Sequence, residues 1–335
     1  PGKVKIAGVL VDDPAPADKI KLVPAEITVI DVELEDGTTI VNEDDIIYIS
    51  SFPEMPQLTA EIKLDNLTGT VDWNIVIEFK RPNRNDQDTF SKTLSASTQW
   101  NIFQEFGVHY YGGKAIITAT YAGVNMGMTF HIRGTNPLET VAATEIGNVP
   151  FYAKAIARHE SEPEQNNRTY LQFNEEGTLG PDYMKNLKDT PNRSSDHQGW
   201  GMYQLTNPIP GRDEVWSWKA NIASGKALIN NNIAEAPAYF AAVQRKYPNK
   251  YEPPPGTYTP PGTTTVLTYL EAAEIQMFNS SSVVELLPNP TPPGGQSYYR
   301  SCWKFNANNQ AGNRWQFVSN SQDYVRKVIE EYENP

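Results

Sequence analysis

Glu160 stands at the end of a predicted helix, in surroundings that favour a protonated carboxyl group. The run FYAKAIARHES predicts a helix over residues 151–161, and Pro163 would end it. Helical spacing places Ala155 and Ile156 on one side, with Glu160 one turn beyond Ile156. The negative end of the helix dipole and the apolar neighbours both raise the pKa of this carboxyl. A carboxyl that stays protonated near neutral pH is what a general acid for glycosidic-bond cleavage needs.

A second segment that could do chemistry is SSDHQGWGMYQL, over residues 194–205. Its glycines would let main-chain groups approach a ligand closely. Its tryptophan and tyrosine could pack on sugar rings or fill a hydrophobic core. The segment supplies the candidate substrate-binding residues Gly199, Trp200, Gly201, Tyr203 and Gln204.

The order of these two motifs resembles that of the lysozyme-like superfamily, which contains the lytic transglycosylases and the goose-type lysozymes. In that family a helix ends in Glu-Ser, and a Gly-x-Gly-Leu-Met-Gln type segment follows and lines the sugar cleft. Here Tyr203 stands where Met is usual, and the gap between the motifs is longer than in many members. The runs MFNSS (277–281) and DYVRKVIEEY (323–332) resemble the family's Tyr-Asn segment and its closing helix. The resemblance covers roughly residues 145–335.

The resemblance implies a mainly α, lysozyme-like domain that cleaves peptidoglycan. The bond cleaved would be the β-1,4 linkage between N-acetylmuramic acid and N-acetylglucosamine, with Glu160 as general acid. Asn279 would be the cleft asparagine of the family. Ser161 follows the acid and would hydrogen-bond near it. A nucleophilic role for Ser161 is disfavoured, because no Ser-His-Asp order or nucleophile elbow surrounds it.

The second catalytic carboxylate is left open by the sequence. Asp196 lies roughly where goose-type enzymes carry an acid that positions water, whereas Glu175 and Glu176 lie in the enlarged gap, where the family has no matching motif. A carboxylate ~6.5–9.5 Å from Glu160 would make the enzyme an inverting hydrolase. Without one, the resemblance implies a transglycosylase, in which the substrate's N-acetyl group attacks and a 1,6-anhydro product forms. We favour hydrolysis with Asp196 as base, since its polar neighbours keep it ionised.

The first half of the chain has the pattern of an all-β domain. Residues 25–137 contain the strand-like runs ITVIDVEL, LTAEIKL, TVDWNIVIEF, KAIITATY and MGMTFHIR. The alternating apolar residues of the third run, from Val71 to Phe79, would line one face of a sheet. We therefore predict a two-sheet sandwich, similar to immunoglobulin-like modules, although no cysteine pair supports that name. Residues 1–24 predict an arm or linker with one strand within 4–11.

The second half changes to helical periodicity, so we predict a two-domain protein with a helical domain over residues 145–335. Residues 136–149 would form the junction. Beyond the first helix, further helices are expected over residues 213–230, 236–247, 265–278 and 322–332. The Pro/Gly-rich runs 248–265 and 287–295 predict surface loops.

Composition excludes several classes of protein. The formal net charge of the 335 residues is −12, with most of the acidic excess in the first half, which argues against a nucleic-acid binder. The single cysteine, Cys302, excludes an intrachain disulfide and a cysteine-based zinc cluster. The four histidines are scattered, so we predict no metal and no cofactor. No apolar run approaches the ~18 residues of a membrane span.

Three readings of the function remain open. The first is a peptidoglycan glycosidase, a muramidase or a lytic transglycosylase, whose partner is the glycan strand. The second is a non-catalytic, wall-binding structural module of a phage tail or injection machine. In the third, the enzyme is the toxic domain of an antibacterial secretion effector, and the producing cell would need an immunity protein to block it. We expect action in the periplasm or at the cell wall. The chain begins with Pro1 and has no visible signal peptide, so we expect a piece of a longer protein.

Overall fold

The computed structural model describes residues 7–8, 27–28, 31–33, 41–62, 69–80, 87–96, 98–161, 170, 173, 199–279, 284–287, 303–317 and 323–334. Contacts divide the chain into a β-rich unit and a mainly helical unit. The β-rich unit comprises Pro1–Leu138, Gln172–Gly201 and Thr206–Lys219. The helical unit comprises Glu139–Leu171, Met202–Leu205 and Ala220–Pro335.

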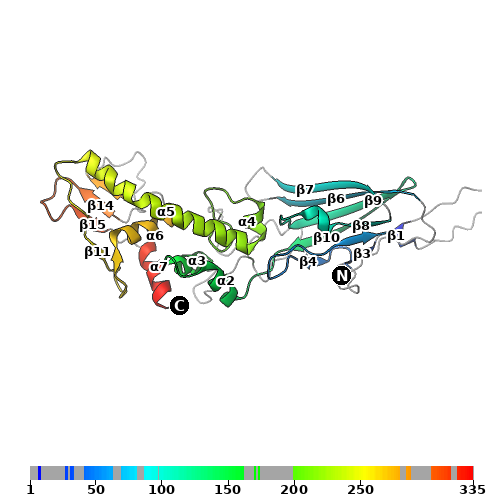
Figure 1. Ribbon diagram of the computed structural model, residues 1–335, viewed down its shortest axis with the longest axis horizontal. Helices are drawn as coiled ribbons and strands as arrows, with labels where there is room; N and C mark the ends of the chain where they lie inside the picture. Colours follow the sequence, from blue (N-terminus) through cyan, green and yellow to red (C-terminus); the bar gives the residue numbers. More distant parts are fainter. Residues whose placement is uncertain are drawn as a thin grey trace, which may run out of the picture. The chain divides into compact units, whose positions relative to one another are not determined.

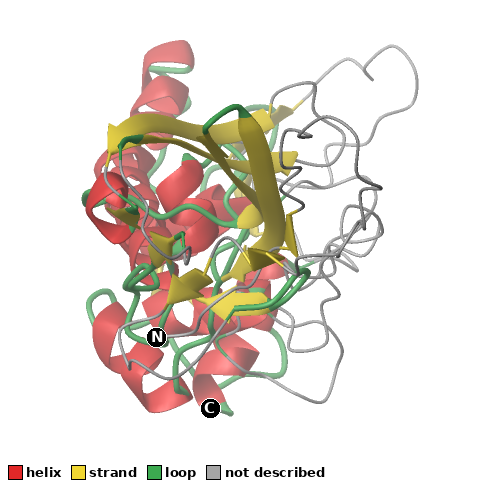
Figure 2. Ribbon diagram, turned by 90° about the vertical axis from the view of Figure 1, so that its right-hand side faces the viewer, coloured by secondary structure: helices red, strands yellow, loops and turns green. Residues whose placement is uncertain are grey.

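The β-rich unit is built on a five-stranded sheet with strand order β4-β10-β9-β6-β7 (Figure 1). In that order the strands are Ile46–Tyr48, Val124–Arg133, Gly113–Tyr121, Val71–Lys80 and Gln87–Ala96. Neighbouring strands are antiparallel except β4 and β10, which are parallel. The long strands are visibly twisted (Figure 2), as expected from the right-handed twist of L-residue strands.

Shorter strands complete this unit. A second sheet has the order β3-β5-β8, with strands Asp31–Glu33, Thr59–Glu61 and Gln99–Asn101. β1 (Ala7–Gly8) pairs with β2 (Ile27–Thr28), and a single helical turn, α1, spans Phe103–Phe106. β1 falls within the strand expected at residues 4–11.

The alternation predicted for β6 is confirmed. Its odd-numbered residues from Val71 to Phe79 are all buried, with Trp73 and Ile75 fully so. Trp73 packs on Trp100 of the second sheet with ring centroids 6.3 Å apart, so the two sheets share one core.

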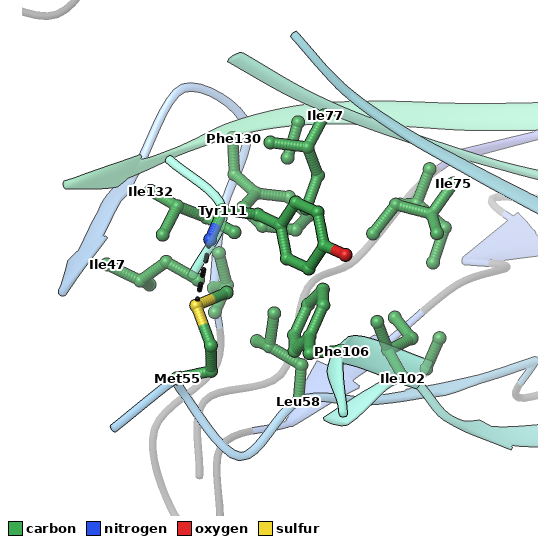
Figure 3. Packing of buried hydrophobic residues seen from close by; sticks show 14 of the residues in the cluster. Ile47, Met55, Leu58, Ile75, Ile77, Ile102, Phe106, Tyr111, Phe130 and Ile132 are labelled. Carbon is green, nitrogen blue, oxygen red and sulfur yellow. Dashed lines mark hydrogen bonds between the residues drawn. The ribbon is translucent and has the colours of Figure 1, made fainter. Parts of the chain in front are cut away.

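The loop after α1, which contains Tyr111, packs into this core. Tyr111 and Phe106 pack beside Leu58 and Ile102 (Figure 3). The backbone N–H of Tyr111 donates to the Met55 sulfur at 3.3 Å. The loop after α1 is thus held by side-chain packing and by a bond from its main chain.

β7 is a strand that we did not predict. Its inward-facing positions are Asp88, Phe90, Lys92, Leu94 and Ala96, so two charged residues interrupt the apolar alternation. Lys92 is accommodated because its Nζ lies 2.8 Å from Oε2 of Glu105, a residue of α1. An edge strand with one paired charge on its inner face carries too weak a period-2 signal to be found from sequence.

A segment from the second half of the chain belongs to the β-rich core, which differs from the predicted division at residue 145. Trp216, the last residue of α4 (Arg212–Trp216), packs on Phe79 with ring centroids 4.9 Å apart. Trp200 also packs on Phe79, with ring centroids 5.9 Å apart. The Trp218 indole N–H donates to the carbonyl of Ser51 at 2.9 Å. Large aromatic rings such as these bury much apolar surface. Their packing explains why Thr206–Lys219 belongs to the β-rich unit.

Most of the helices lie in the second half of the chain. Its helices are α2 (Glu139–Ile146), α3 (Ala153–Glu160), α5 (Trp218–Lys246), α6 (Tyr269–Asn279) and α7 (Tyr324–Glu333). Its short strands are β11 (Thr257–Tyr258), β12 (Leu267–Thr268), β13 (Val284–Leu287), β14 (Trp303–Asn306) and β15 (Trp315–Phe317). α3 and α7 lie side by side, and α6 also packs on α7 (Figure 1). The helices predicted at 151–161, 265–278 and 322–332 are confirmed, with small changes at their ends. The expected junction contains α2.

The two helices predicted over 213–230 and 236–247 are wrong in their division. The break lies at Ser217, whose backbone is extended, and α5 then continues through Pro237. Buried Ile229, Ala236 and Phe240 keep the helical spacing across the asparagine run that we took for an end. The Pro/Gly-rich run 248–265 is mostly exposed but contains the edge strand β11, which pairs with β12. Among the described residues, no helix is long and apolar enough to cross a membrane.

The packing of two tryptophans on Phe79 predicts a large stability loss on truncation. Phe79→Ala should lower the free energy of unfolding by about 3–5 kcal/mol, the cost of an unfilled cavity after removal of a buried ring. Phe52→Ala is the matched control, because the Phe52 side chain is 66% exposed. Urea unfolding followed by tryptophan fluorescence measures both. Equal effects of the two substitutions would contradict this account of the core.

Candidate active site

The site is built at the C-terminal end of α3. This helix of eight residues packs through buried Ala153, Ala155, Ile156 and Ala157. Its last helical residue is Glu160, and the N–H of the C-cap residue Ser161 donates to the carbonyl of Ala157 at 3.0 Å. The predicted position of Glu160 at a helix C-terminus is therefore confirmed.

The start of α7 supplies the partner of Glu160. The Asp323 side chain caps α7 by accepting from the N–H of Arg326 at 3.2 Å. The next residue, Tyr324, is buried, and so are Val325 and Val328 on the same apolar face. The cap fixes where α7 begins, so it also fixes the place of the tyrosine that follows it.

The Tyr324 hydroxyl donates to Oε1 of Glu160 at 2.6 Å. The ring of His159 meets the Tyr324 ring edge-on, with centroids 5.2 Å apart. The short O–H···O contact is typical of a charge-assisted bond when the carboxyl is ionised. The two helices thus meet at a carboxyl and a phenol that come from opposite ends of the helical unit's sequence.

The pKa of Glu160 is raised to about 7, and burial is the main cause. The hydrogen bond from Tyr324 acts in the opposite direction and lowers it. The raised pKa agrees with the expectation from sequence, and the apolar surroundings provide it. Burial, together with the nearby carboxyl, also raises the pKa of Tyr324 well above its ordinary value, so this phenol keeps its proton.

Ser161 and Asn279 occupy different environments. Ser161 is fully buried, and its hydroxyl donates to the carbonyl of Arg158 at 3.4 Å. It therefore helps to close the end of α3. Asn279 is the last residue of α6 and is exposed, so it remains accessible to a ligand.

The two aromatic residues of the 199–204 segment fill hydrophobic cores, which is one of the two roles left open for them. Trp200 is buried against Phe79 in the β-rich unit. Tyr203 is buried in the helical unit, where its hydroxyl donates to the carbonyl of Ala153 at 3.1 Å. Neither ring is exposed for stacking on a sugar, so the structure favours the core role of the two that were left open.

The glycines and the glutamine of this segment shape its backbone. Gly201 has φ of +73°, which suits glycine, and Gln204 has φ of +44°, which is uncommon for a residue with a side chain. Gly199 is buried and Gln204 is partly exposed. Left-handed residues on both sides of Tyr203 turn the chain so that its ring covers Gly225, where a Cβ would lie 2.3 Å from the ring.

The candidates for the second carboxylate, Asp196, Glu175 and Glu176, lie outside the described residues. Their roles stay predictions. Within the described ranges, no group of three or more His, Cys, Asp or Glu side chains could hold a metal ion.

Sequence reasoning placed the closing helix but assigned no role to Tyr324. The pair Asp-Tyr at its start carries a signal in retrospect, because an aspartate N-cap fixes the next residue in the first turn. Comparison of the chain with family models, curated proteins and solved structures finds no match. The functional argument therefore rests on the residues themselves.

The raised pKa of Glu160 has a direct consequence for stability. Between its ordinary value of 4.5 and about 7, the folded chain holds a proton that the unfolded chain releases. The contribution of this group is thus fully present below pH 4.5 and is lost as the pH rises through 7. Unfolding free energies of wild type minus Glu160→Gln should therefore fall by about 3 kcal/mol over this window. Exposed Glu235→Gln is the control, and a flat difference curve for Glu160 would contradict the assignment.

Proposed function

We propose that this protein is a peptidoglycan glycosidase in which Glu160 acts as the general acid. The observation that carries the proposal is a carboxyl with a pKa of about 7, fixed by a tyrosine at the end of a helix. Such a group is protonated in a useful fraction at neutral pH, as protonation of a leaving glycosidic oxygen requires. The Glu-Ser motif and the three motifs after it support the choice of peptidoglycan as substrate.

The contact with Tyr324 suggests how the acid would work. Oε1 of Glu160 accepts the hydrogen bond from Tyr324. When the carboxyl is neutral, its own proton would therefore be carried by Oε2. From there it would pass to the oxygen between N-acetylmuramic acid and N-acetylglucosamine. Glu160 then becomes a carboxylate, and the same hydrogen bond stabilises that charge. Tyr324 therefore favours the product state of the proton transfer and limits the rise in pKa that burial causes.

Two fold assignments accompany this proposal. We propose that the β-rich unit is an immunoglobulin-like sandwich, supported by its two sheets with a shared core. We also propose that the helical unit is lysozyme-like, supported by the Glu-bearing α3 packed on a closing helix. The β-rich unit would then act as a spacer or adaptor for the catalytic part.

The product depends on a second group. With Asp196, or with Glu175 or Glu176, as base, water would attack the sugar and the enzyme would be a muramidase. Without such a base, the substrate's N-acetyl group would attack and a 1,6-anhydro end would form. We favour hydrolysis with Asp196 because its neighbours in SSDHQ are polar and support an ionised carboxylate.

This proposal also sets a place of action. The substrate lies in the cell wall, so the protein would act in the periplasm or at the wall after secretion or delivery by a phage tail or secretion machine. If it is a toxic effector, the producing cell would need an immunity protein that blocks the cleft.

The first test is loss of the acid. Glu160→Gln keeps the size of the side chain but cannot donate the proton, so the rate of lysis of purified peptidoglycan should fall by ~10²–10⁴-fold or more. Circular dichroism checks that the variant is folded, and Glu235→Gln should keep full activity because Glu235 is exposed on α5. A folded Glu160→Gln protein with activity within tenfold of wild type would show that Glu160 is not the acid. If wild type and Glu160→Gln are both inactive on peptidoglycan, the result would favour a non-catalytic wall-binding module.

The second test concerns the product. Mass spectrometry of digested muropeptides should show reducing N-acetylmuramic acid ends, heavier than anhydro ends by one water. Asp196→Asn should lower the rate by at least ~10²-fold, the size expected for loss of a positioned base. Predominantly anhydro products, or an Asp196→Asn enzyme with nearly full activity, would indicate a transglycosylase with a single catalytic glutamate.

A further inference from the structure

A second tyrosine–carboxyl hydrogen bond lies at the other end of α3. The hydroxyl of Tyr152, the N-cap residue of this helix, donates to Oε2 of Glu274 at 2.6 Å. Glu274 is on α6, 122 residues further along the chain. α3 is therefore bonded at its start to α6 and at its end to α7, each time through a phenol and a carboxyl.

This second bond is set in a largely apolar environment. The side chain of Tyr152 is 1% exposed, and α6 buries Ala273 and Ile275 on either side of Glu274 in sequence. Burial raises the pKa of Glu274, while the bond from Tyr152 lowers it. Glu271, one turn earlier on α6, also acts on Glu274, but its carboxylate is bonded to the N–H and hydroxyl of Thr268. Glu274 is partly buried, whereas the Tyr152 hydroxyl belongs to a buried side chain. Leaving that hydroxyl unpaired is costly, so the contact resists displacement.

The position of this bond relates two candidate site residues. Tyr152 lies eight positions before Glu160, and Glu274 lies five before Asn279, the last residue of α6. An α-helix rises 1.5 Å per residue, so the bond is roughly 12 Å along α3 from Glu160 and roughly 8 Å along α6 from Asn279. One contact thus fixes the helix that ends in the acid against the helix that ends in the exposed amide.

We propose that Glu274 is a positioning residue for the reaction of Glu160, acting through Tyr152 and α3. This inference rests on the proposed glycosidase function. α3 has eight residues, fewer than an isolated helix needs to persist in water, so its direction depends on its tertiary contacts. Removing the anchor at the start of α3 tilts its end and moves the acid relative to the bound sugar. Misplacement of an acid lowers the rate of the chemical step more than it weakens binding.

The test compares four variants of the full chain on soluble muropeptide fragments. Glu274→Leu and Tyr152→Phe should each lower kcat by ~10–10²-fold with KM within about threefold of wild type, the pattern of a misplaced acid. Glu274→Gln keeps an oxygen that accepts from Tyr152, so it should restore most of kcat. Tyr332→Phe is the matched control, since it removes a phenol at a half-exposed position and keeps the ring contact with Phe151.

A readout that needs no turnover separates this proposal from the proposed function. The pKa of Glu160, followed by carbon-13 NMR, should rise in Glu274→Leu, because a displaced α3 loses part of the bond from Tyr324 that lowers this pKa. If wild type shows no glycosidase activity but the pKa of Glu160 still rises in Glu274→Leu, the glycosidase proposal fails while the positioning of Glu160 by Glu274 is supported. An unchanged pKa in Glu274→Leu, or loss of kcat that Glu274→Gln does not restore, would overturn the positioning role. Thermal melting of each variant checks that the effects come from folded protein.

Discussion

The hydrogen bond from Tyr324 to Glu160 is the interaction on which the candidate site depends. It joins the last residue of α3 to the first residue of α7. Each helix contributes a buried apolar stripe to the same contact, and the bond forms beside these stripes at a part-buried position. A polar contact in such a place is electrostatically stronger than in water, and leaving either group unpaired is costly. The apolar surfaces therefore supply most of the stability, and the bond specifies how the helices are aligned.

The chemistry of Glu160 follows from two opposed effects. Burial alone would raise its pKa further and make it a poor proton donor at neutral pH, whereas the tyrosine bond lowers the pKa. General acid catalysis is most effective when the pKa lies near the working pH. The balance near 7 is thus a property of the helix pair, because burial comes from the packing and the donor comes from the start of α7.

The sequence predicted elements with local signals and missed those that depend on distant partners. β6 and α3 were found because alternation and helical spacing are visible within ten residues. β7 was missed because Asp88 and Lys92 interrupt the apolar alternation on one of its faces, and the partner of Lys92, Glu105, lies on another element. The raised pKa of Glu160 followed from its place in the helix, but Tyr324 is 164 residues away, and no local pattern selects it. Trp200 was left between two roles because burial by Phe79 is likewise a long-range fact.

The packing of Trp216 on Phe79 bears on how this protein could be rearranged. A Cβ at Gly112 would lie 2.3 Å from the Trp216 ring, so the strand region and the later segment are fitted to each other at the level of single atoms. A single recombination crossover near residue 140 would give the β strands a foreign partner in place of Trp216 and would leave Phe79 and Gly112 facing a surface shaped for another ring. Exchange of the helical unit between related chains would therefore need to carry Thr206–Lys219 with the β-rich unit. The β-rich unit is therefore discontinuous along the sequence.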